Sequence, residues 1–194
     1  MNQDELKSAI RRGLERLSDA QDEDGSFPGD YGGPLFLLPL FILTARCVGL
    51  ELSDDEAREM IRYIQGQQNA DGGWGLHVEG ASTVYGSTSN YVALRLLGVD
   101  ADSTECRRAR SWLNTAGGPL GSASWGKFFL SLCGLYEWRG LNPLMPELWL
   151  LPTSLPIHPS KLWCHCRMVY LPMSYLYAER WSFDDPIVAE LKEE

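Results

Sequence analysis

Apolar side chains recur at helical spacing along most of the chain. Near the N-terminus, four of them are separated by four, four and three residues, which predicts a helix over residues 4–20 with one apolar face. They are Leu6, Ile10, Leu14 and Leu17. Residues 35–50 are apolar nearly all round, which predicts a buried helix that bends at Pro39.

Start and stop signals predict further helices and no strand. Ser53 followed by Glu56 forms a capping box, so a helix should begin there and run to about residue 68. Between residues 141 and 159 closely spaced prolines allow only short helical pieces, and Pro172 should break or kink a later helix. The remaining helices are expected over residues 82–97, 103–114, 124–138, 162–180 and 186–194. The predicted fold class is therefore all-α.

Two stretches, near residues 11–27 and 58–74, repeat one pattern. Each has a helix, a glutamine, an acidic turn, a glycine and then an aromatic residue. Gln21 precedes Phe27 by six positions, and Gln68 precedes Trp74 by the same number. A glutamine amide can bond peptide groups exposed at a helix end, and an aromatic ring can cover that end. Such repeats predict stacked helical hairpins, as in a solenoid or a closed α/α ring.

Composition narrows the possible partners and compartments. The 194 residues carry a net charge of −9, which disfavours nucleic acid and electrostatic attraction to an anionic membrane surface. No apolar run reaches the ~18 residues of a membrane span, and the acidic N-terminus does not resemble a signal peptide. Five cysteines, an odd number, are typical of free thiols in a reducing compartment. We therefore expect an intracellular protein.

The segment WCHCRMVYLPMSY, residues 163–175, gathers the most chemistry-bearing side chains. Its Cys-His-Cys run suits zinc poorly, because paired zinc ligands are usually separated by two to four residues. A C-x-C pair is also not the C-x-x-C of redox sites, and adjacent Cys and His rarely form a nucleophile pair. Packed, unreactive thiols are the favoured reading from local composition. No metal, cofactor or catalytic residue is predicted here.

Helical spacing suggests which side chains of this segment lie together. Trp163, Cys166 and Tyr170 are separated by three and four residues, so one helical face could carry all three. His165 should then point roughly the opposite way, unless the helix begins after it. Core packing remains the alternative for this face.

Charged groups elsewhere give little sign of acid chemistry. Four carboxylates beside glycine, aromatic or proline residues are expected to cap helices or pair with arginine. They are Asp30, Glu79, Glu137 and Glu147. Arg167 lies in an apolar stretch and should need a carboxylate or a backbone carbonyl as partner.

Four long segments together resemble the oxidosqualene cyclase family. They are DGSFPGDYGGPLFLLPLFIL, QNADGGWGLHVEGASTVYGSTSNYVALRLLG, SWGKFFLSLCGLYEWRGLNPLMPELWLLP and PIHPSKLWCHCRMVYLPMSYLYAER. The similarity runs from about residue 11 to about residue 185, in the same order as in that family. The glutamine-to-aromatic repeat resembles the family's QW motif, with Phe27 in place of the usual tryptophan.

The resemblance implies a fold and a set of site residues. The family's fold is two α/α barrels enclosing an apolar cavity, and this chain would be a single partial domain over residues 1–194 from the N-terminal third. Matching by motif implies six residues that line the substrate cavity or its entry channel. They are Tyr31, Trp125, Trp163, His165, Cys166 and Tyr170.

The resemblance also implies a function, with alternatives. The chain would contribute cavity wall and channel to an isomerase that cyclises 2,3-oxidosqualene to a sterol or triterpene, without a cofactor. The sequence contains no D-C-T-A-E motif, whose first Asp is the family's proton donor, so we expect no catalysis by these residues alone. The alternatives are a non-catalytic isoprenoid- or sterol-binding module, or one half of a split cyclase. Full-length relatives associate with one membrane leaflet, which implies the endoplasmic reticulum or lipid droplet in a eukaryote and the cytoplasmic membrane in a bacterium.

Overall fold

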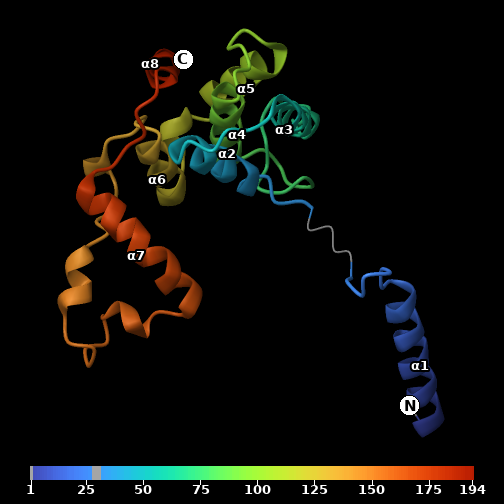
Figure 1. The fold of residues 1–194 in the computed structure, drawn as a ribbon. Coiled ribbons are helices and arrows are strands. Elements are labelled where there is room, and N and C mark those ends of the chain that lie inside the picture. Colours follow the sequence, from blue (N-terminus) through green and yellow to red (C-terminus); the bar gives the residue numbers. More distant parts are fainter. Residues whose placement is uncertain (1, 28–31) are drawn as a thin grey trace. The chain divides into compact units, whose positions relative to one another are not determined.

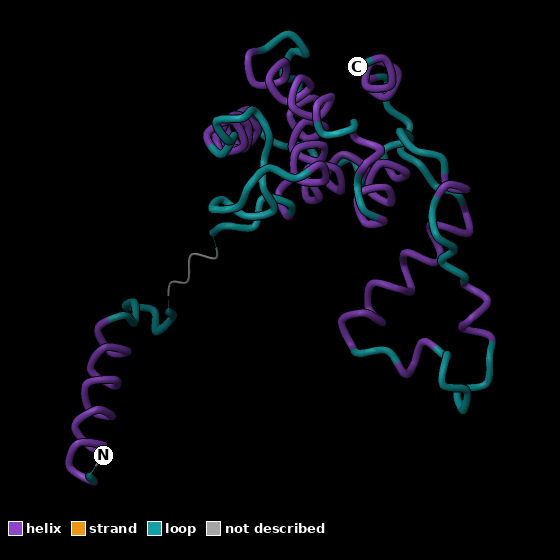
Figure 2. Tube along the Cα trace, turned by 180° about the vertical axis from the view of Figure 1, so that it is seen from behind, coloured by secondary structure: helices purple, strands orange, loops and turns teal. Residues whose placement is uncertain are grey.

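The computed structural model describes residues 2–27 and 32–194 of the chain, and within them every regular element is helical (Figures 1 and 2). The only pairing of strand type in these ranges is an isolated bridge between Pro34 and His77. The α-helices are α1 Gln3–Asp19, α2 Leu37–Cys47, α3 Asp54–Gly66, α4 Val84–Leu96, α5 Thr104–Thr115, α6 Ser124–Leu132, α7 Cys164–Glu179 and α8 Ile187–Glu193. The 3-10 helices are η1 Pro119–Gly121, η2 Trp138–Gly140, η3 Pro146–Leu150 and η4 Pro159–Lys161. The all-α prediction is confirmed, while the barrel arrangement stays a prediction.

The chain forms two compact units, Met1–Gly33 and Pro34–Glu194. The first contains α1, which begins at a capping box in which Asn2 and Glu5 exchange two hydrogen bonds of 2.8 Å. The apolar stripe predicted from the sequence is present but exposed, from 44% for Leu6 to 61% for Leu14. The prediction that residues 1–194 make one partial domain stays a prediction.

Helix α4 lies at the centre of the larger unit and contacts α2, α3, α5, α6 and α8. All ten residues 86–95 are buried, and small side chains allow this because they let neighbouring backbone approach closely. A Cβ on Gly86 would come within 2.5 Å of the carbonyl oxygens of Trp74 and Gly75. The buried Asn90 donates to the Leu35 carbonyl at 3.1 Å, which ties the start of α2 to the core.

Two predicted helices are shorter than their apolar patterns. The expected helix over residues 35–50 spans only Leu37–Cys47, so Pro39 falls in its first turn, where a missing N–H leaves no hydrogen bond unmade. No full helical turn precedes Pro39, and the bend predicted there stays a prediction. The helix expected over residues 124–138 ends at Leu132, because Gly134 adopts a φ of 70° and the chain turns there.

Of the predicted break or kink at Pro172, the break is wrong, and the kink stays a prediction. Helix α7 continues through Pro172 and ends after Glu179, where Arg180 adopts a left-handed φ of 52°. The expected short helical pieces in the preceding proline-rich segment are confirmed as η3 and η4, each of which has a proline in its first turn. No helix in the described ranges has the length and apolarity that a membrane crossing requires.

The two glutamines of the repeated pattern make the same local hydrogen bond. Gln21 donates to the Gly25 carbonyl at 2.7 Å, and Gln68 donates to the Gly72 carbonyl at 2.9 Å. Gln68 also donates to the Glu105 carbonyl at the start of α5, at 2.9 Å. The second copy therefore joins the end of α3 to the start of α5.

We expect Gln68→Ala to lower the free energy of unfolding of the Pro34–Glu194 unit by about 1–2 kcal/mol, because two partly buried carbonyls lose their donor. Gln21→Ala is the matched control and should change it by less than about 0.5 kcal/mol. Urea unfolding followed by tryptophan fluorescence measures this unit alone, since all seven tryptophans lie beyond residue 33. Equal effects of the two substitutions would contradict the joining role of Gln68.

Candidate functional site

The predicted aromatic segment begins with Trp163, which precedes α7 and does not belong to it. Its backbone is extended, with φ −53° and ψ 147°, and the helix begins at Cys164. The indole is 69% exposed and packs edge-on against His165, with ring centroids 4.5 Å apart. The expectation that Trp163 shares a helical face while His165 points the opposite way is therefore wrong. It assumed a helix that already includes residue 163.

Tyr170, five residues after His165 in α7, belongs to a second aromatic group. Its hydroxyl donates to the Met145 carbonyl at 3.0 Å, and its ring lies 6.3 Å from that of Trp149 in η3. Trp149 in turn packs edge-on against His158. Burial, with a smaller effect from the Glu147 charge, raises the pKa of Tyr170, so its phenol stays protonated. These contacts hold the proline-rich segment against the first half of α7.

Around these rings α7 and the preceding segment present an apolar surface. The exposed Arg167 lies on the same stretch, and its guanidinium donates to the Ser160 carbonyl at 3.3 Å, a backbone partner of the kind that the sequence predicts for this side chain. Cys164 and Cys166 are exposed free thiols on the same stretch. We call this the α7 apolar face, and its large exposed members are Leu150, Ile157, Leu162, Trp163, Met168, Val169, Leu171 and Tyr175.

Trp125 belongs to a separate group near the start of α6. Its ring stacks on Phe128 with centroids 6.2 Å apart and is 42% exposed. It lines an open hollow of about 600 Å³, of which Phe36 and Tyr85 are also walls. It also lines a small cavity of about 100 Å³ together with Met173 of α7. Trp125 therefore adjoins the middle of α7, while Trp163 and His165 lie at its beginning.

Cys166 and Tyr31 are the two remaining residues that the sequence predicts for the site. Cys166 lies in the first turn of α7, three residues from Trp163. Tyr31 lies outside the described residues.

Within residues 2–27 and 32–194, no three His, Cys, Asp or Glu side chains are grouped so that they could hold a metal ion. His158 uses Nδ1 to accept from the Ser160 backbone N–H at 3.0 Å, which accounts for its burial locally.

The α7 apolar face offers exposed aliphatic and aromatic side chains. Glu137 lies outside this face and is one of the carboxylates predicted to cap a helix or pair with arginine. It forms an ion pair with Arg139, which lowers the pKa of the Glu137 carboxyl. The side chains that define the face are the Trp163 indole, the Tyr175 phenol, the Met168 thioether and aliphatic groups, with the Cys164 and Cys166 thiols on the same stretch. Aromatic faces attract cations, by about 0.5–2 kcal/mol each and more when water is excluded. Such a surface can hold an apolar molecule and stabilise positive charge on it.

Sequence reasoning missed Trp149, His158, Met145 and Met173, which complete these groups. A usable signal was present for Trp149. It lies between Pro146 and Pro152, so it must sit on a short, tightly constrained turn that presents its ring in one direction. Met145 contributes only its backbone carbonyl, so no side-chain pattern could have revealed it.

The fold and these groups define an all-helical domain with an open aromatic surface. Comparison with known proteins identifies its family. A sequence model of the squalene-hopene cyclase N-terminal domain matches residues 10–193, so the chain belongs to that family. The resemblance read from the four sequence segments is thereby confirmed.

Relatives show how the chain compares with whole enzymes. It is 53% identical over 175 residues to the lanosterol synthase of Mus musculus, covering 90% of this chain and 24% of that protein. It is 51% identical over 175 residues to the cycloartenol synthase of Dictyostelium discoideum, covering 90% and 25%. Alpha-onocerin synthase LCD of Lycopodium clavatum is 41% identical over 202 residues, covering 100% and 26%. The chain thus spans about a quarter of the length of these curated relatives.

Proposed function

We propose that the chain supplies part of the cavity wall and substrate channel of an oxidosqualene cyclase, whose substrate is 2,3-oxidosqualene. The observation that carries the proposal is the α7 apolar face: a run of large apolar side chains left exposed around Trp163, on a segment held in place by the Tyr170–Met145 hydrogen bond. Relatives that cover most of this chain are named as lanosterol and cycloartenol synthases. An isolated folded domain has little reason to expose such a face.

The physical chemistry of polyene cyclisation suits these residues. Opening of a protonated epoxide places positive charge on a hydrocarbon chain, and the charge then moves along it. Indole and phenol rings stabilise that charge through their quadrupoles, and apolar walls exclude the water that would quench it. A shaped wall also holds the flexible chain in a reactive fold, which lowers the entropic cost of reaction. We assign these roles to Trp125, Trp163, His165, Cys166 and Tyr170, and include Tyr31 by its sequence motif.

The proton that starts the reaction must come from elsewhere in the cyclase. No D-C-T-A-E motif occurs in these 194 residues, and the named groups of the α7 apolar face include no carboxylic acid. We therefore place this chain against the remaining three quarters of a cyclase.

Photolabelling tests the assignment on the purified chain. A benzophenone or diazirine analogue of 2,3-oxidosqualene is irradiated with the protein, and its adducts are mapped by mass spectrometry. We expect saturable adducts between residues 163 and 170, and at Trp125, which excess unlabelled oxidosqualene removes. Leu6 and Ile10 on α1 serve as the internal control, because they are apolar and, at 44% and 54%, at least as exposed as Trp125 at 42%, but lie outside the proposed wall. Labelling of α1 equal to that of α7 would contradict the assignment.

A further inference from the structure

Trp125 is a wall that two apolar spaces share. One space is the open hollow of about 600 Å³ beside Phe36 and Tyr85. The other is the cavity of about 100 Å³ that reaches Met173 of α7, which we call the recess. Of the described residues, only Trp125 lines both spaces. This residue therefore lies between the proposed substrate wall and a smaller space behind it.

The indole ring itself lies at this boundary. It stacks on Phe128, a wall of the recess, with ring centroids 6.2 Å apart and ring planes inclined by 20°. On the other side it meets Tyr85, a wall of the hollow. Burial raises the pKa of the Tyr85 phenol, and the neighbouring Trp125 side chain partly offsets that rise. The ring thus has one aromatic neighbour from each space.

The recess is apolar, and its two polar side chains pair with each other. Asn142 Nδ2 donates to Ser124 Oγ at 3.4 Å, and the other walls are Phe128, Leu141, Leu144, Met173 and Trp125 itself. A buried water molecule needs two to four polar partners, so the recess should stay dry. Its volume is below the roughly 150 Å³ of an apolar cavity that binds benzene, so it suits part of a ring better than a separate ligand.

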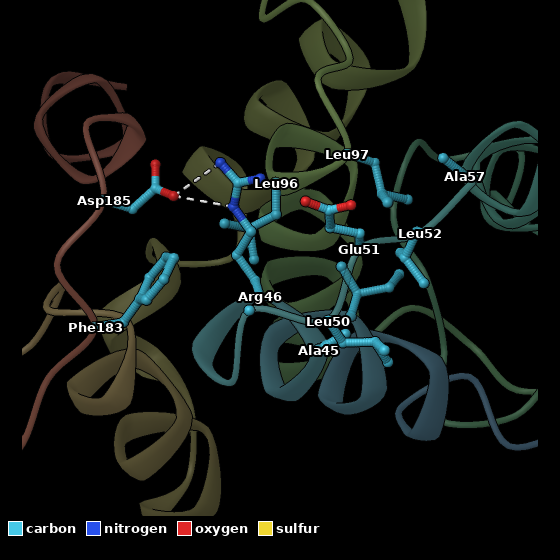
Figure 3. A pocket seen from close by; sticks show the side chains of 12 residues that line it. Ala45, Arg46, Leu50, Glu51, Leu52, Ala57, Leu96, Leu97, Phe183 and Asp185 are labelled. Atoms are coloured by element: carbon cyan, nitrogen blue, oxygen red, sulfur yellow. Dashed lines mark hydrogen bonds and ion pairs between the residues drawn. The ribbon is translucent and has the colours of Figure 1, made fainter. Parts of the chain in front are cut away.

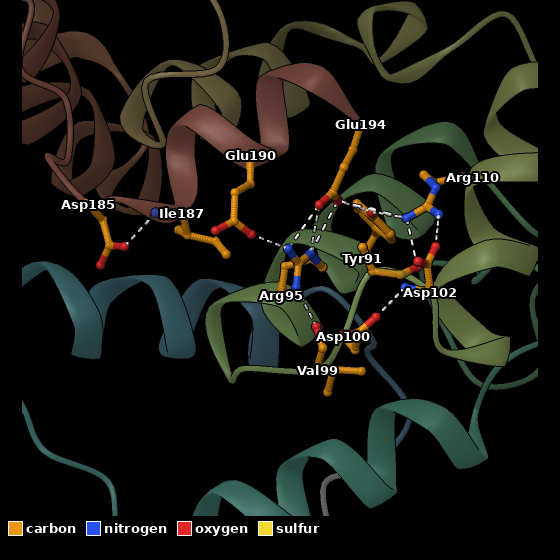
Figure 4. Close-up of polar contacts among 11 residues, drawn as sticks. Tyr91, Arg95, Val99, Asp100, Asp102, Arg110, Asp185, Ile187, Glu190 and Glu194 are labelled. Atoms are coloured by element: carbon orange, nitrogen blue, oxygen red, sulfur yellow. Dashed lines mark hydrogen bonds and ion pairs between the residues drawn. The ribbon is translucent and has the colours of Figure 1, made fainter.

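The Trp125 ring is held less firmly than a fully buried aromatic side chain. It is 42% exposed, and the Tyr85 oxygen beside it makes no hydrogen bond of normal geometry within the described residues. The Tyr91 ring is fixed differently, because its hydroxyl donates to the Glu194 carboxylate and accepts from Arg110 Nη1 at 2.9 Å (Figure 4). Stacking on one ring next to an empty space leaves Trp125 room to change its side-chain torsions.

We propose that the recess takes up part of the Trp125 indole when a bulky substrate occupies the hollow, which makes Leu144 and Met173 positioning residues for Trp125. The walls of an empty space lack van der Waals partners, so a ring that enters it gains contacts there. Retreat of the ring widens the hollow, and its return narrows the hollow around the folded chain. The inference rests on the proposed function, because it assigns two positions to a residue of the proposed substrate wall.

Fluorine NMR of the purified chain, labelled with 5-fluorotryptophan, tests the movement. The resonance is assigned with Trp125→Phe. We expect microsecond-to-millisecond exchange at Trp125, and a saturable shift under xenon, which binds empty apolar cavities. Leu144→Phe fills the recess and should remove both signals. Leu120→Phe should remove neither, because Leu120 lines neither space. Absence of either signal in the unsubstituted chain, or persistence of both in Leu144→Phe, would overturn the proposal.

Photolabelling separates this inference from the proposed function. In Leu144→Phe the ring cannot retreat, so half-saturation of the Trp125 adduct should require at least about threefold more of the 2,3-oxidosqualene analogue. Adducts between residues 163 and 170 should half-saturate at an unchanged concentration. An unchanged concentration at Trp125 would overturn the inference, although the saturable adducts would still support the proposed function. Absence of saturable adducts at all these residues would contradict the proposed function, and the fluorine signals would then decide whether the recess accepts the ring.

Discussion

Replacing Trp74 with alanine is expected to lower the free energy of unfolding of the Pro34–Glu194 unit by about 3–5 kcal/mol. The side chain is completely buried in the cluster formed by α2, α3, α4 and α5. Its indole N–H donates to the Ile64 carbonyl near the end of α3 at 2.7 Å. The substitution therefore opens a large cavity and leaves a buried carbonyl without its donor, two costs that add.

Two further variants separate these costs. Trp74→Phe keeps most of the ring but loses the donor, and should cost about 1–3 kcal/mol. Trp163→Ala is the matched control, since that indole is 69% exposed and its removal should change stability by about 0.5 kcal/mol or less. Urea unfolding followed by circular dichroism is the appropriate measurement, because the substitutions alter fluorescence. A Trp74→Ala cost no larger than that of Trp163→Ala would show that the pattern's aromatic residue does not anchor the core.

Replacing Arg95 with methionine is expected to cost about 3 kcal/mol, because it removes one member of a buried charge network. The Arg95 side chain is 7% exposed and its Nη2 lies 2.7 Å from Glu190 and 2.9 Å from Glu194. Its Nη1 donates to the Val99 carbonyl at 2.6 Å. The substitution leaves the Glu194 carboxylate, whose side chain is 14% exposed, without its main cation. The C-terminal segment should then separate from α4.

The C-terminal segment has a second attachment to the larger unit, and the chain also offers an exposed ion pair as a control. Arg46 on α2 pairs with Asp185 at 2.9 Å just before α8, so the segment is held at both ends (Figure 3). Arg58→Met removes an exposed pair with Asp55 within α3 and should cost less than about 0.5 kcal/mol. Glu194→Gln should lower the free energy of unfolding by less than Arg95→Met does. The double variant should lower it by less than the sum of the two single variants. Additive costs would contradict a shared network.

Local signals in the sequence located the helices whose ends carry capping residues. Helix α3 begins as expected because Ser53 and Glu56 form the predicted box, with hydrogen bonds of 2.9 and 3.3 Å. The extents of α2 and α6 were overestimated because apolar residues continue beyond the end of each helix, into the exposed Val48 and Leu50 after α2 and into a partly buried loop after α6. Trp138 illustrates this, since it is buried in η2, outside the helix that its hydrophobicity suggested. The end of each of these helices is instead set by glycine, at Gly49 with a φ of 68° and at Gly134 with a φ of 70°.

The candidate site was only partly predictable, because its geometry depends on distant contacts. The family resemblance proposed Trp125, Trp163 and Tyr170 as site residues, and periodicity could not show that Trp163 precedes the helix. The carbonyl that fixes Tyr170 lies 25 residues away, in a segment of prolines. Arg95 is separated from Glu194 by 99 residues, and among 26 acidic side chains no local pattern selects that partner.

The most direct test of the account is a chimera. In the lanosterol synthase of Mus musculus, the 24% of the enzyme that matches this chain is replaced by the matching residues of the chain, and cyclised product from 2,3-oxidosqualene is measured by gas chromatography and mass spectrometry. We predict a cyclised sterol or triterpene, a loss of more than tenfold in Trp163→Ala, and no product from the unfused chain. A folded chimera that binds 2,3-oxidosqualene but forms no cyclised product, or turnover by the unfused chain, would contradict the proposal that these residues form a cavity wall whose proton donor lies elsewhere.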